Sequence, residues 1–303
     1  MGEKMKAKED IFLLTVEEVA DILRVQPLAV FKRLYGKELL AIKLGCKTVR
    51  FRKSEPYRYI NWKESQNFYI KGKKFENIGD VNNTVECLKN ATSIYPLNKF
   101  AHLELGKIYY KNIKEDQTYY ELAKQRFEKG LKIDFEDRDI HLYLGKMGIT
   151  PQELNSHNSN SIEEELLTIK ELSEIFRVQY LKAYEMVINN EIRGIHIGRW
   201  KIRRTEIERY LEQQESELVY KWAIEEKELG NIDNAIEYFK ETTRIYPFHR
   251  DAHLQLAEIY REKMKSDKIY LLWALKRLEK AFKIDPERLE IQEKIKELEK
   301  LKN

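Results

Sequence analysis

Two stretches of the chain share one pattern of apolar and polar positions. The first runs from Leu13 to Ile60 and the second from Leu166 to Leu211. Each opens with a threonine followed three residues later by a glutamate, which is the capping box that satisfies free amides at a helix start. The capping pairs are Thr15 with Glu18 and Thr168 with Glu171, and the apolar residues that follow at helical spacing are Val16, Val19, Ile22 and Leu23, then Ile169, Leu172, Ile175 and Phe176. Each stretch therefore predicts a capped amphipathic helix at its start.

A second helix and a β-hairpin are predicted after this first helix. The tripeptide Arg-Val-Gln interrupts both stretches, and a second apolar run follows it, over Gln26–Tyr35 and Gln179–Ile188. The composition then changes to β-branched and basic residues around Gly45, in 42–52, and around Gly198, in 195–203. A glycine inside such a segment is typical of the turn between two antiparallel strands.

This order of elements resembles the excisionase family of winged helix-turn-helix domains, related to the mercury-resistance-regulator (MerR) type. In the later stretch the matching residues are Leu167 to Ile169, Arg177-Val178, Glu191-Ile192, Ile197-Gly198, Trp200 to Ile202 and Thr205 to Ile207; in the earlier stretch they are Leu14 to Val16, Arg24-Val25, Glu38-Leu39, Leu44-Gly45 and Ser54-Glu55. The chain departs from the family where Gln26 and Gln179 cap the second helix and where Val49 replaces the tryptophan of the hairpin, or wing. The resemblance implies binding of double-stranded DNA by the second helix and the wing.

The segment after each stretch is repeated as well. Residues 51–135 align without a gap to residues 202–286, and within them Ile-Tyr-Pro, Ala-His-Leu and Lys-Ile-Asp each occur in both halves. Small residues and aromatic residues alternate there at positions that let two helices approach closely, and prolines end the second helix of a pair. This spacing resembles tetratricopeptide (TPR) repeats. It predicts two helical hairpins per half, then capping helices at Asp137–Met147 and Glu287–Leu301. The resemblance implies that the arrays dock a protein partner.

The fold class that follows is mainly α, with two winged helix-turn-helix domains alternating with two short TPR-like arrays. The predicted boundaries are 11–62 and 163–213 for the winged domains, 63–149 and 214–303 for the arrays, and 150–162 for an Asn/Ser-rich linker. Thr205 and Glu208 suggest another capping box, and the chain has neither Gly nor Pro from there to Leu229. The last helix of the second winged domain is therefore expected to continue into the second array.

Composition supports a soluble, mostly helical protein. Charged residues make up 35% of the chain, while Gly and Pro number only 12 and 6, which is unlike a sheet protein or a disordered one. No apolar run is long enough to span a membrane, and the N-terminal residues lack the apolar region of a secretory signal. Cys46 and Cys87 have no partners at metal-binding spacing, and Cys87 is expected to be buried. We expect a reduced, cytoplasmic setting.

The clearest chemical signal is basic charge in the two wings. No acid occurs from Leu39 to Lys53 or from Ile192 to Thr205, so these segments would meet a phosphate backbone without repulsion. The residues predicted to contact DNA from the wings are Lys43, Lys47, Arg50, Arg52 and Lys53, then Arg193, Arg199, Lys201, Arg203 and Arg204. A solvated basic surface is the alternative reading, and the recurrence in both copies favours nucleic acid.

The second helices supply the remaining candidates for DNA contact. These are Gln26, Lys32 and Arg33 in the first copy and Gln179, Tyr180 and Lys182 in the second, residue types that reach base edges or phosphates. Glu185 would repel phosphate, and Met186 replaces Arg33, so the first copy is expected to bind DNA more strongly. The alternative for the second copy is a structural or protein-binding remnant.

No catalytic motif is present: the chain has no phosphate-binding glycine loop, no HExxH and no nucleophile elbow. His102 and His253 fall on inner faces of predicted repeat helices, where packing is favoured over metal binding. We therefore expect no enzyme activity and no cofactor. The sequence predicts a double-stranded DNA-binding transcriptional or architectural regulator that docks a protein partner, or itself, through the TPR-like repeats. The alternative is a scaffold whose helix-turn-helix domains bind protein instead of DNA.

Overall fold

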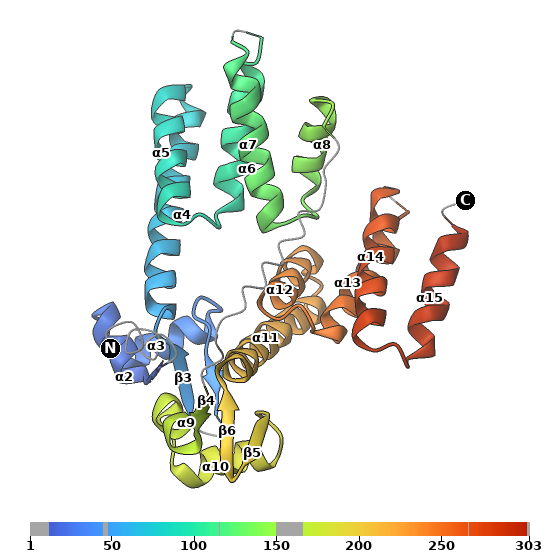
Figure 1. Ribbon diagram of the computed structural model, residues 1–303. Helices are drawn as coiled ribbons and strands as arrows, with labels where there is room; N and C mark the ends of the chain where they lie inside the picture. Colours follow the sequence, from blue (N-terminus) through green and yellow to red (C-terminus); the bar gives the residue numbers. More distant parts are fainter. Residues whose placement is uncertain (1–11, 45–47, 115, 150–165, 266, 302–303) are drawn as a thin grey trace. The chain divides into compact units, whose positions relative to one another are not determined.

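The computed structural model describes residues 12–44, 48–114, 116–149, 166–265 and 267–301 (Figure 1). The chain separates into two compact units. The first unit comprises Met1–Pro56 with Ile162–Asn303, and the second comprises Tyr57–Ser161. The first unit thus holds the second predicted helix-turn-helix stretch and the first one as far as Pro56, although about a hundred residues separate them along the chain. The predicted linker at 150–162 lies outside the described residues.

The first predicted stretch forms what we call module A, residues 12–54. Its elements are β1 (Leu13–Leu14), α2 (Val16–Leu23), α3 (Pro27–Tyr35), β2 (Ile42–Lys43) and β3 (Val49–Arg52). The capping box at Thr15 is confirmed: its hydroxyl accepts from the Glu18 amide, and the Glu18 carboxylate accepts from the Thr15 amide at 2.9 Å. Strand β3 pairs antiparallel with both β1 and β2, and we call β2 and β3 hairpin A.

The second stretch forms module B, residues 166–203, with the same order of elements. These are β4 (Leu166–Thr168), α9 (Ile169–Phe176), α10 (Tyr180–Ile188), β5 (Gly194–Ile197) and β6 (Arg199–Arg203), and we call β5 and β6 hairpin B. The predicted break between the two helices is confirmed in both modules, because Arg24 and Arg177 adopt left-handed φ angles of 53° and 52°. Each of these residues is the C-cap of the first helix of its module.

The two modules share apolar contacts. The core of module B contains Ile175, Phe176 and Met186, and it continues without a break to Leu13, Ile42 and Leu44 of module A. Burying apolar surface is the main favourable term in packing one element on another. Modules A and B therefore pack on each other within the first unit.

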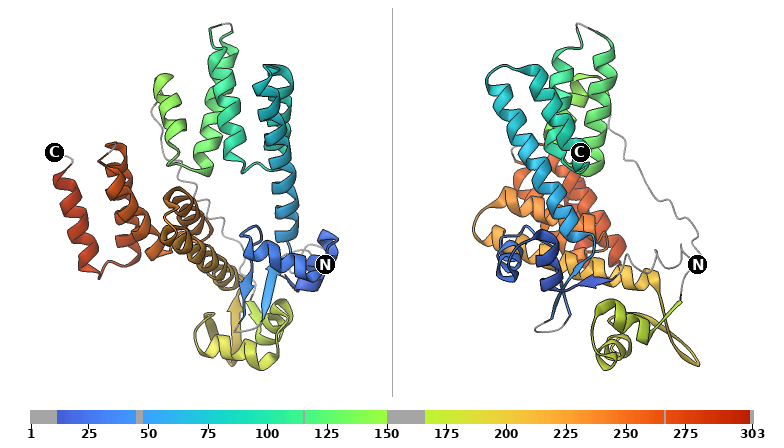
Figure 2. Two further views of the ribbon diagram at one scale, coloured as in Figure 1. Left: turned by 180° about the vertical axis from the view of Figure 1, so that it is seen from behind. Right: turned by 90° about the vertical axis from the view of Figure 1, so that its left-hand side faces the viewer.

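One long helix, α11 (Arg204–Glu228), follows module B and begins the second array. The expected continuous helix is confirmed, but the capping box at Thr205 is wrong: α11 already begins at Arg204, which places Thr205 inside the helix. The rest of the array is α12 (Ile232–Ile245), α13 (Arg250–Lys263), α14 (Ile269–Ile284) and α15 (Leu289–Lys300). In each view α11 passes close to hairpin A (Figures 1 and 2), and it contacts β2.

The first array consists of α4 (Glu55–Asn77), α5 (Val81–Ile94), α6 (Lys99–Lys111), α7 (Thr118–Ile133) and α8 (Arg138–Lys146). Successive helices pack as antiparallel pairs, as the small-residue pattern predicts. Gly106 shows why: a Cβ there would lie 2.4 Å from the Phe127 ring, so only glycine lets α6 approach α7. Cys87 is buried in α5, as expected. The described part of the chain is thus mainly helical, with small antiparallel sheets and TPR-like hairpin arrays.

Candidate nucleic-acid interface

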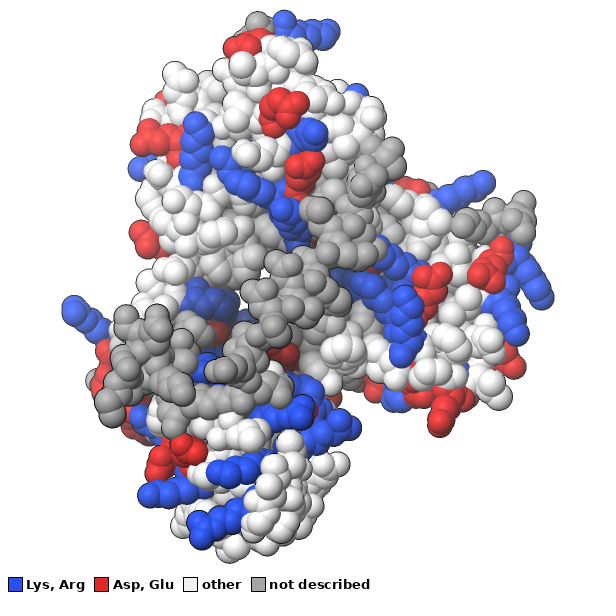
Figure 3. Space-filling view, viewed as in Figure 1, with Lys and Arg blue, Asp and Glu red and all other residues white. Residues whose placement is uncertain are grey.

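Hairpin B carries basic side chains on its surface. Arg193, Arg199 and Arg203 are exposed, and Lys201 and Arg204 are half-buried. The hairpin register pairs Ile195 with Lys201 and Ile197 with Arg199. Figure 3 shows Lys and Arg side chains spread over the part of the first unit that module B forms. Arg199, Lys201 and Arg203 thus lie on strand β6, while Arg193 directly precedes hairpin B and Arg204 directly follows it.

Two glycines shape hairpin B. Gly198 occupies the turn with φ +67°, a conformation that side chains other than glycine rarely adopt. A Cβ on Gly194 would lie 2.6 Å from Val187 and 2.8 Å from the indole of Trp200, so glycine there makes room for the tryptophan. Trp200 also meets the His196 ring edge to face, with centroids 5.1 Å apart. Local packing thus holds the basic strand β6 in place.

Helix α10 presents a mixed surface. Gln179 is exposed at the N-cap, and Tyr180 is exposed and stacked on Tyr184. Lys182 is half-buried, and the acidic Glu185 is exposed. Leu181 and Ile188 remain 63% and 51% exposed. This helix therefore offers polar groups at its N-terminus and apolar groups along its length.

Helix α3 of module A has one exposed cation. Lys32 is exposed and Gln26 is exposed at the N-cap. Arg33 is half-buried and donates to the Ala29 carbonyl of its own helix at 2.9 Å. The corresponding residue in module B, Met186, is fully buried, because this helix position faces inward. Met186 thus fills a core position of module B.

The structure corrects the role predicted for Arg52. Its guanidinium donates to Glu208 at 2.7 Å and to both oxygens of Glu215, at 2.8 and 2.9 Å, on α11. Burial disfavours the charged form, but the two glutamates outweigh it and raise the pKa of Arg52. Burial also raises the pKa of Glu215 to about 7, against the pull of Arg52. Arg52 is thus used inside the first unit and is not directed to a phosphate.

Arg50 of hairpin A is also turned inward. Its guanidinium donates to its neighbour's carbonyl, at Val49, and to the Arg177 carbonyl of module B at 3.0 Å. Lys43 and Lys53 are exposed. Lys47 lies outside the described residues. Of the predicted basic set in hairpin A, the described part thus leaves two exposed lysines for an outside ligand.

Sequence reasoning missed Lys37, which follows α3. Its ammonium group bonds Glu226 at 2.7 Å and Glu225 at 3.3 Å, and it lies 5.4 Å from the centre of the Tyr238 ring. Hydrogen bonds from Lys37, Asn231 and Asn234 lower the pKa of Glu226 to about 2. The acids of α11 are visible in the sequence, but a surface helix usually carries such charges, so they indicated no partner.

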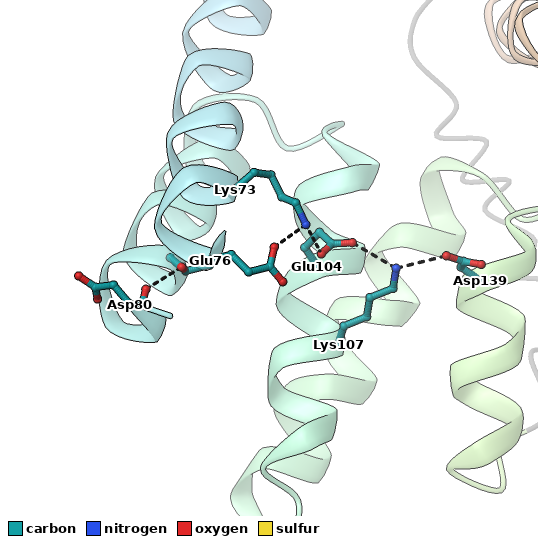
Figure 4. Close-up of polar contacts among 7 residues, drawn as sticks. Lys73, Glu76, Asp80, Glu104, Lys107 and Asp139 are labelled. Atoms are coloured by element: carbon teal, nitrogen blue, oxygen red, sulfur yellow. Dashed lines mark hydrogen bonds and ion pairs between the residues drawn. The ribbon is translucent and has the colours of Figure 1, made fainter. Parts of the chain in front are cut away.

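In the second unit, helices α4, α6 and α8 carry a row of side chains of alternating charge (Figure 4). Lys73 of α4 pairs with Glu76 and with Glu104 of α6, and Lys107 joins Glu104 to Asp139 of α8, at 3.2 Å on each side. In the second array, Glu258 of α13 lies 4.0 Å from Lys227 of α11 and 3.4 Å from Lys294 of α15. Both arrays thus present a charged face, which α4, α6 and α8 form in one array and α11, α13 and α15 form in the other.

The two repeat histidines are packed, as predicted. His102 and His253 are 3% and 2% exposed, and the Nε2 atom of each lies about 3 Å from a proline carbonyl, of Pro96 and Pro247. Burial lowers the pKa of His102 to about 4. These side chains belong to the array cores.

Comparison with known families identifies one part of the chain. Residues 166–215 match the model of a family described as a helix-turn-helix domain. The match covers module B and the start of α11 and therefore includes both α9 and α10. No curated protein matches the chain.

Several solved structures are similar to the chain at low identity. One is YrrB, described as a TPR protein with an unusual peptide-binding site, at 19% identity over 76% of this chain and 90% of that one, with a TM-score of 0.23. Another is MamA, at 17% identity over 75% and 95%, with a TM-score of 0.25. The TPR domain of P58(IPK) gives 15% identity over 95% and 65%, with a TM-score of 0.26.

No helix within the described ranges is both long and apolar enough to cross a membrane.

Proposed function

We propose that the protein binds double-stranded DNA and acts as a transcriptional or architectural regulator, with its TPR-like arrays docking a protein partner. One observation carries this proposal: an acid-free basic hairpin stands on the surface next to the second helix of a helix-turn-helix domain. In such domains the second helix enters the major groove. Lys and Arg on a neighbouring hairpin would then meet the phosphates.

The roles follow from position. Gln179 and Lys182 of α10, with Tyr180, would face base edges and backbone, and Arg193, Arg199 and Lys201 would neutralise phosphates. Module A would contribute Lys32 of α3 and the exposed Lys43 and Lys53. Its order of elements supports reading both modules as excisionase- or MerR-like winged domains that arose by duplication. We place this activity in the cytoplasm and propose a binding protein without catalysis.

A mobility-shift titration with genomic duplex fragments over a series of salt concentrations tests this proposal. Phosphate contacts release counterions, so affinity should fall steeply with salt, by about 0.9 logarithmic units per tenfold salt for each contact. The variant Arg199→Glu with Lys201→Glu should bind every fragment more weakly. Its matched control, Lys296→Glu with Lys300→Glu, makes the same charge change on α15 and should bind as the unaltered chain does. Equal affinity for both variants would refute DNA binding through hairpin B.

A second function is favoured by one observation. The exposed Leu181 and Ile188, with Glu185 between them, form a surface that suits a protein helix better than a phosphate backbone. Under this scaffold reading, DNA binding would be weak and insensitive to salt. The same titration separates the two functions.

A further inference from the structure

Module A lies along α11 and is held there by ion pairs at two places. Near the start of the helix, Arg52 bonds Glu208 and Glu215. Near its end, Lys37 bonds Glu225 and Glu226. The Arg52 pair is well shielded, since the two side chains are 22% and 9% exposed. Ion pairs shielded from water are screened less by salt than exposed ones.

Module A also contacts module B directly. Glu18, which caps α2, forms an ion pair with Arg177 of module B, and Arg50 donates to the carbonyl of the same arginine. Arg177 is the left-handed residue between α9 and α10. Leu13, Ile42 and Leu44 join the apolar core of module B beside these contacts. The turn between the two helices of module B is therefore braced by hairpin A and α2.

Most of the acids of α11 that bond module A have no acidic counterpart on α4, the equivalent helix of the first array. Arg52 and Arg203 hold equivalent places, because each ends the hairpin and pairs with the first strand of its module, at Leu13 and Leu166. By the same alignment, α4 has Tyr57 where α11 has Glu208, and Lys74 and Phe75 where α11 has Glu225 and Glu226. Only Glu215 has an acidic counterpart, Glu64. The docking charges thus exist on one of the two long helices.

We propose that modules A and B form a preassembled pair that reads two DNA half-sites at one fixed separation and one helical phase. Arg52 and Lys37 act as positioning residues that hold α3 relative to α10. This inference rests on the proposed DNA binding for its functional half. A tether of repeats and linker would instead let the half-sites vary in spacing, since a flexible tether sets only an effective concentration.

The first test needs no DNA. Glu17 of α2 and Lys170 of α9 are exposed and hold matching positions in the two modules, so each can be changed to cysteine and spin-labelled in full chains whose native Cys46 and Cys87 are replaced by alanine. Electron paramagnetic resonance then measures the distribution of distances between the labels. We expect a single narrow distribution of distances in the otherwise unaltered chain. The double variant Arg52→Glu with Lys37→Glu should broaden it. The compensating pair Arg52→Glu with Glu215→Arg should narrow it again, which guards against misfolding of the first variant.

The second test uses a duplex selected by the full chain from random sequence, with 5 bp inserted between its two protected segments. Half a helical turn rotates one half-site to the opposite face, so affinity should fall by about tenfold or more. Arg52→Glu with Lys37→Glu should bind both duplexes about equally, since a loosened pair tolerates the insertion. Lys296→Glu with Lys300→Glu should keep the full discrimination.

The outcomes are separable. A broad label distribution in the unaltered chain would overturn the preassembled pair whatever the DNA result. A distribution that the Arg52 and Lys37 changes leave narrow would overturn the positioning role of these two residues. A narrow distribution with no duplex bound would leave the pair standing and refute the proposed function. A narrow distribution with equal binding to both duplexes would show that the pair does not set the spacing.

Discussion

Hairpins A and B have equivalent places in their modules but opposite surroundings. In hairpin A, Arg50 and Arg52 turn toward module B and α11, and Lys43 and Lys53 remain exposed. In hairpin B, Arg193, Arg199 and Arg203 are all exposed. Both segments are basic and lack acids, so the difference lies in what each hairpin packs against.

This difference bears on one expectation. The sequence favoured the first copy as the stronger DNA binder, whereas the structure uses part of its basic set for internal contacts. The helix-turn-helix family match also falls on module B. A basic segment therefore indicates an anionic partner, and that partner can be a glutamate-rich helix of the same chain as well as a phosphate backbone.

The largest expected effect comes from neutralising Arg52. Arg52→Gln leaves the Glu215 carboxylate buried without its partner, which should lower the free energy of unfolding by about 3 kcal/mol. We place the loss at the low end of the range for broken buried pairs because Glu215 can take up a proton. Urea denaturation of the full chain measures it. Arg199→Gln, the control on hairpin B, should change stability by less than about 0.5 kcal/mol; equal losses would show that the two hairpins are equivalent after all.

The pH dependence of the free energy of unfolding should come from Glu215, the partner of Arg52 in hairpin A. Because the folded-state pKa of Glu215, about 7, exceeds its ordinary value of 4.5, the folded chain binds more protons between these values. Its contribution to stability is therefore greatest below pH 4.5 and declines as pH rises toward 7, by at most about 3 kcal/mol. Urea titrations at pH 5 and pH 8 should show that decline, and Glu215→Gln should lack it. A Glu215→Gln profile parallel to that of the unaltered chain would contradict this assignment.

Packing inside hairpin B gives a smaller effect. Gly194→Ala would push a methyl group against Val187 and Trp200, and overpacking of this kind costs about 2 kcal/mol. In module A the places of Gly194 and Trp200 are taken by Ala41 and Val49, so the alanine there meets a smaller side chain. The double change Gly194→Ala with Trp200→Val should therefore recover part of the loss in a thermal melt. No recovery would mean that the two hairpins are not packed alike.

The smallest expected effect separates the hairpins by salt dependence. Arg199→Gln with Lys201→Gln should weaken DNA binding about tenfold and reduce the salt slope by about 2, as two phosphate contacts are lost. Arg50→Gln should leave the slope unchanged, since its guanidinium is directed to the Arg177 carbonyl. Fluorescence anisotropy with labelled duplex over a salt series measures both. A slope that falls equally in the two variants would place Arg50 on the DNA.

Much of the local structure could be predicted from the sequence. The capping boxes at Thr15 and Thr168, the breaks at Arg24 and Arg177 and the turn at Gly198 depend on residues within a few positions of one another. Helical spacing likewise predicted the continuous α11 and the hairpins of both arrays. These features are decided by backbone geometry and neighbouring side chains, which a linear pattern records.

The candidate interface was only partly predictable, and the reason is distance along the chain. Arg52 and Arg203 sit at equivalent places in nearly the same local pattern, so no local rule separates them. The acids that bond these cations lie more than 150 positions later in the chain: Glu208 and Glu215 for Arg52, and Glu226 for Lys37. The sequence by itself determined the elements and the basic character of both hairpins; only the packing of module A on α11 decided which cations are neutralised within the molecule, because electrostatic partners are set by proximity in space.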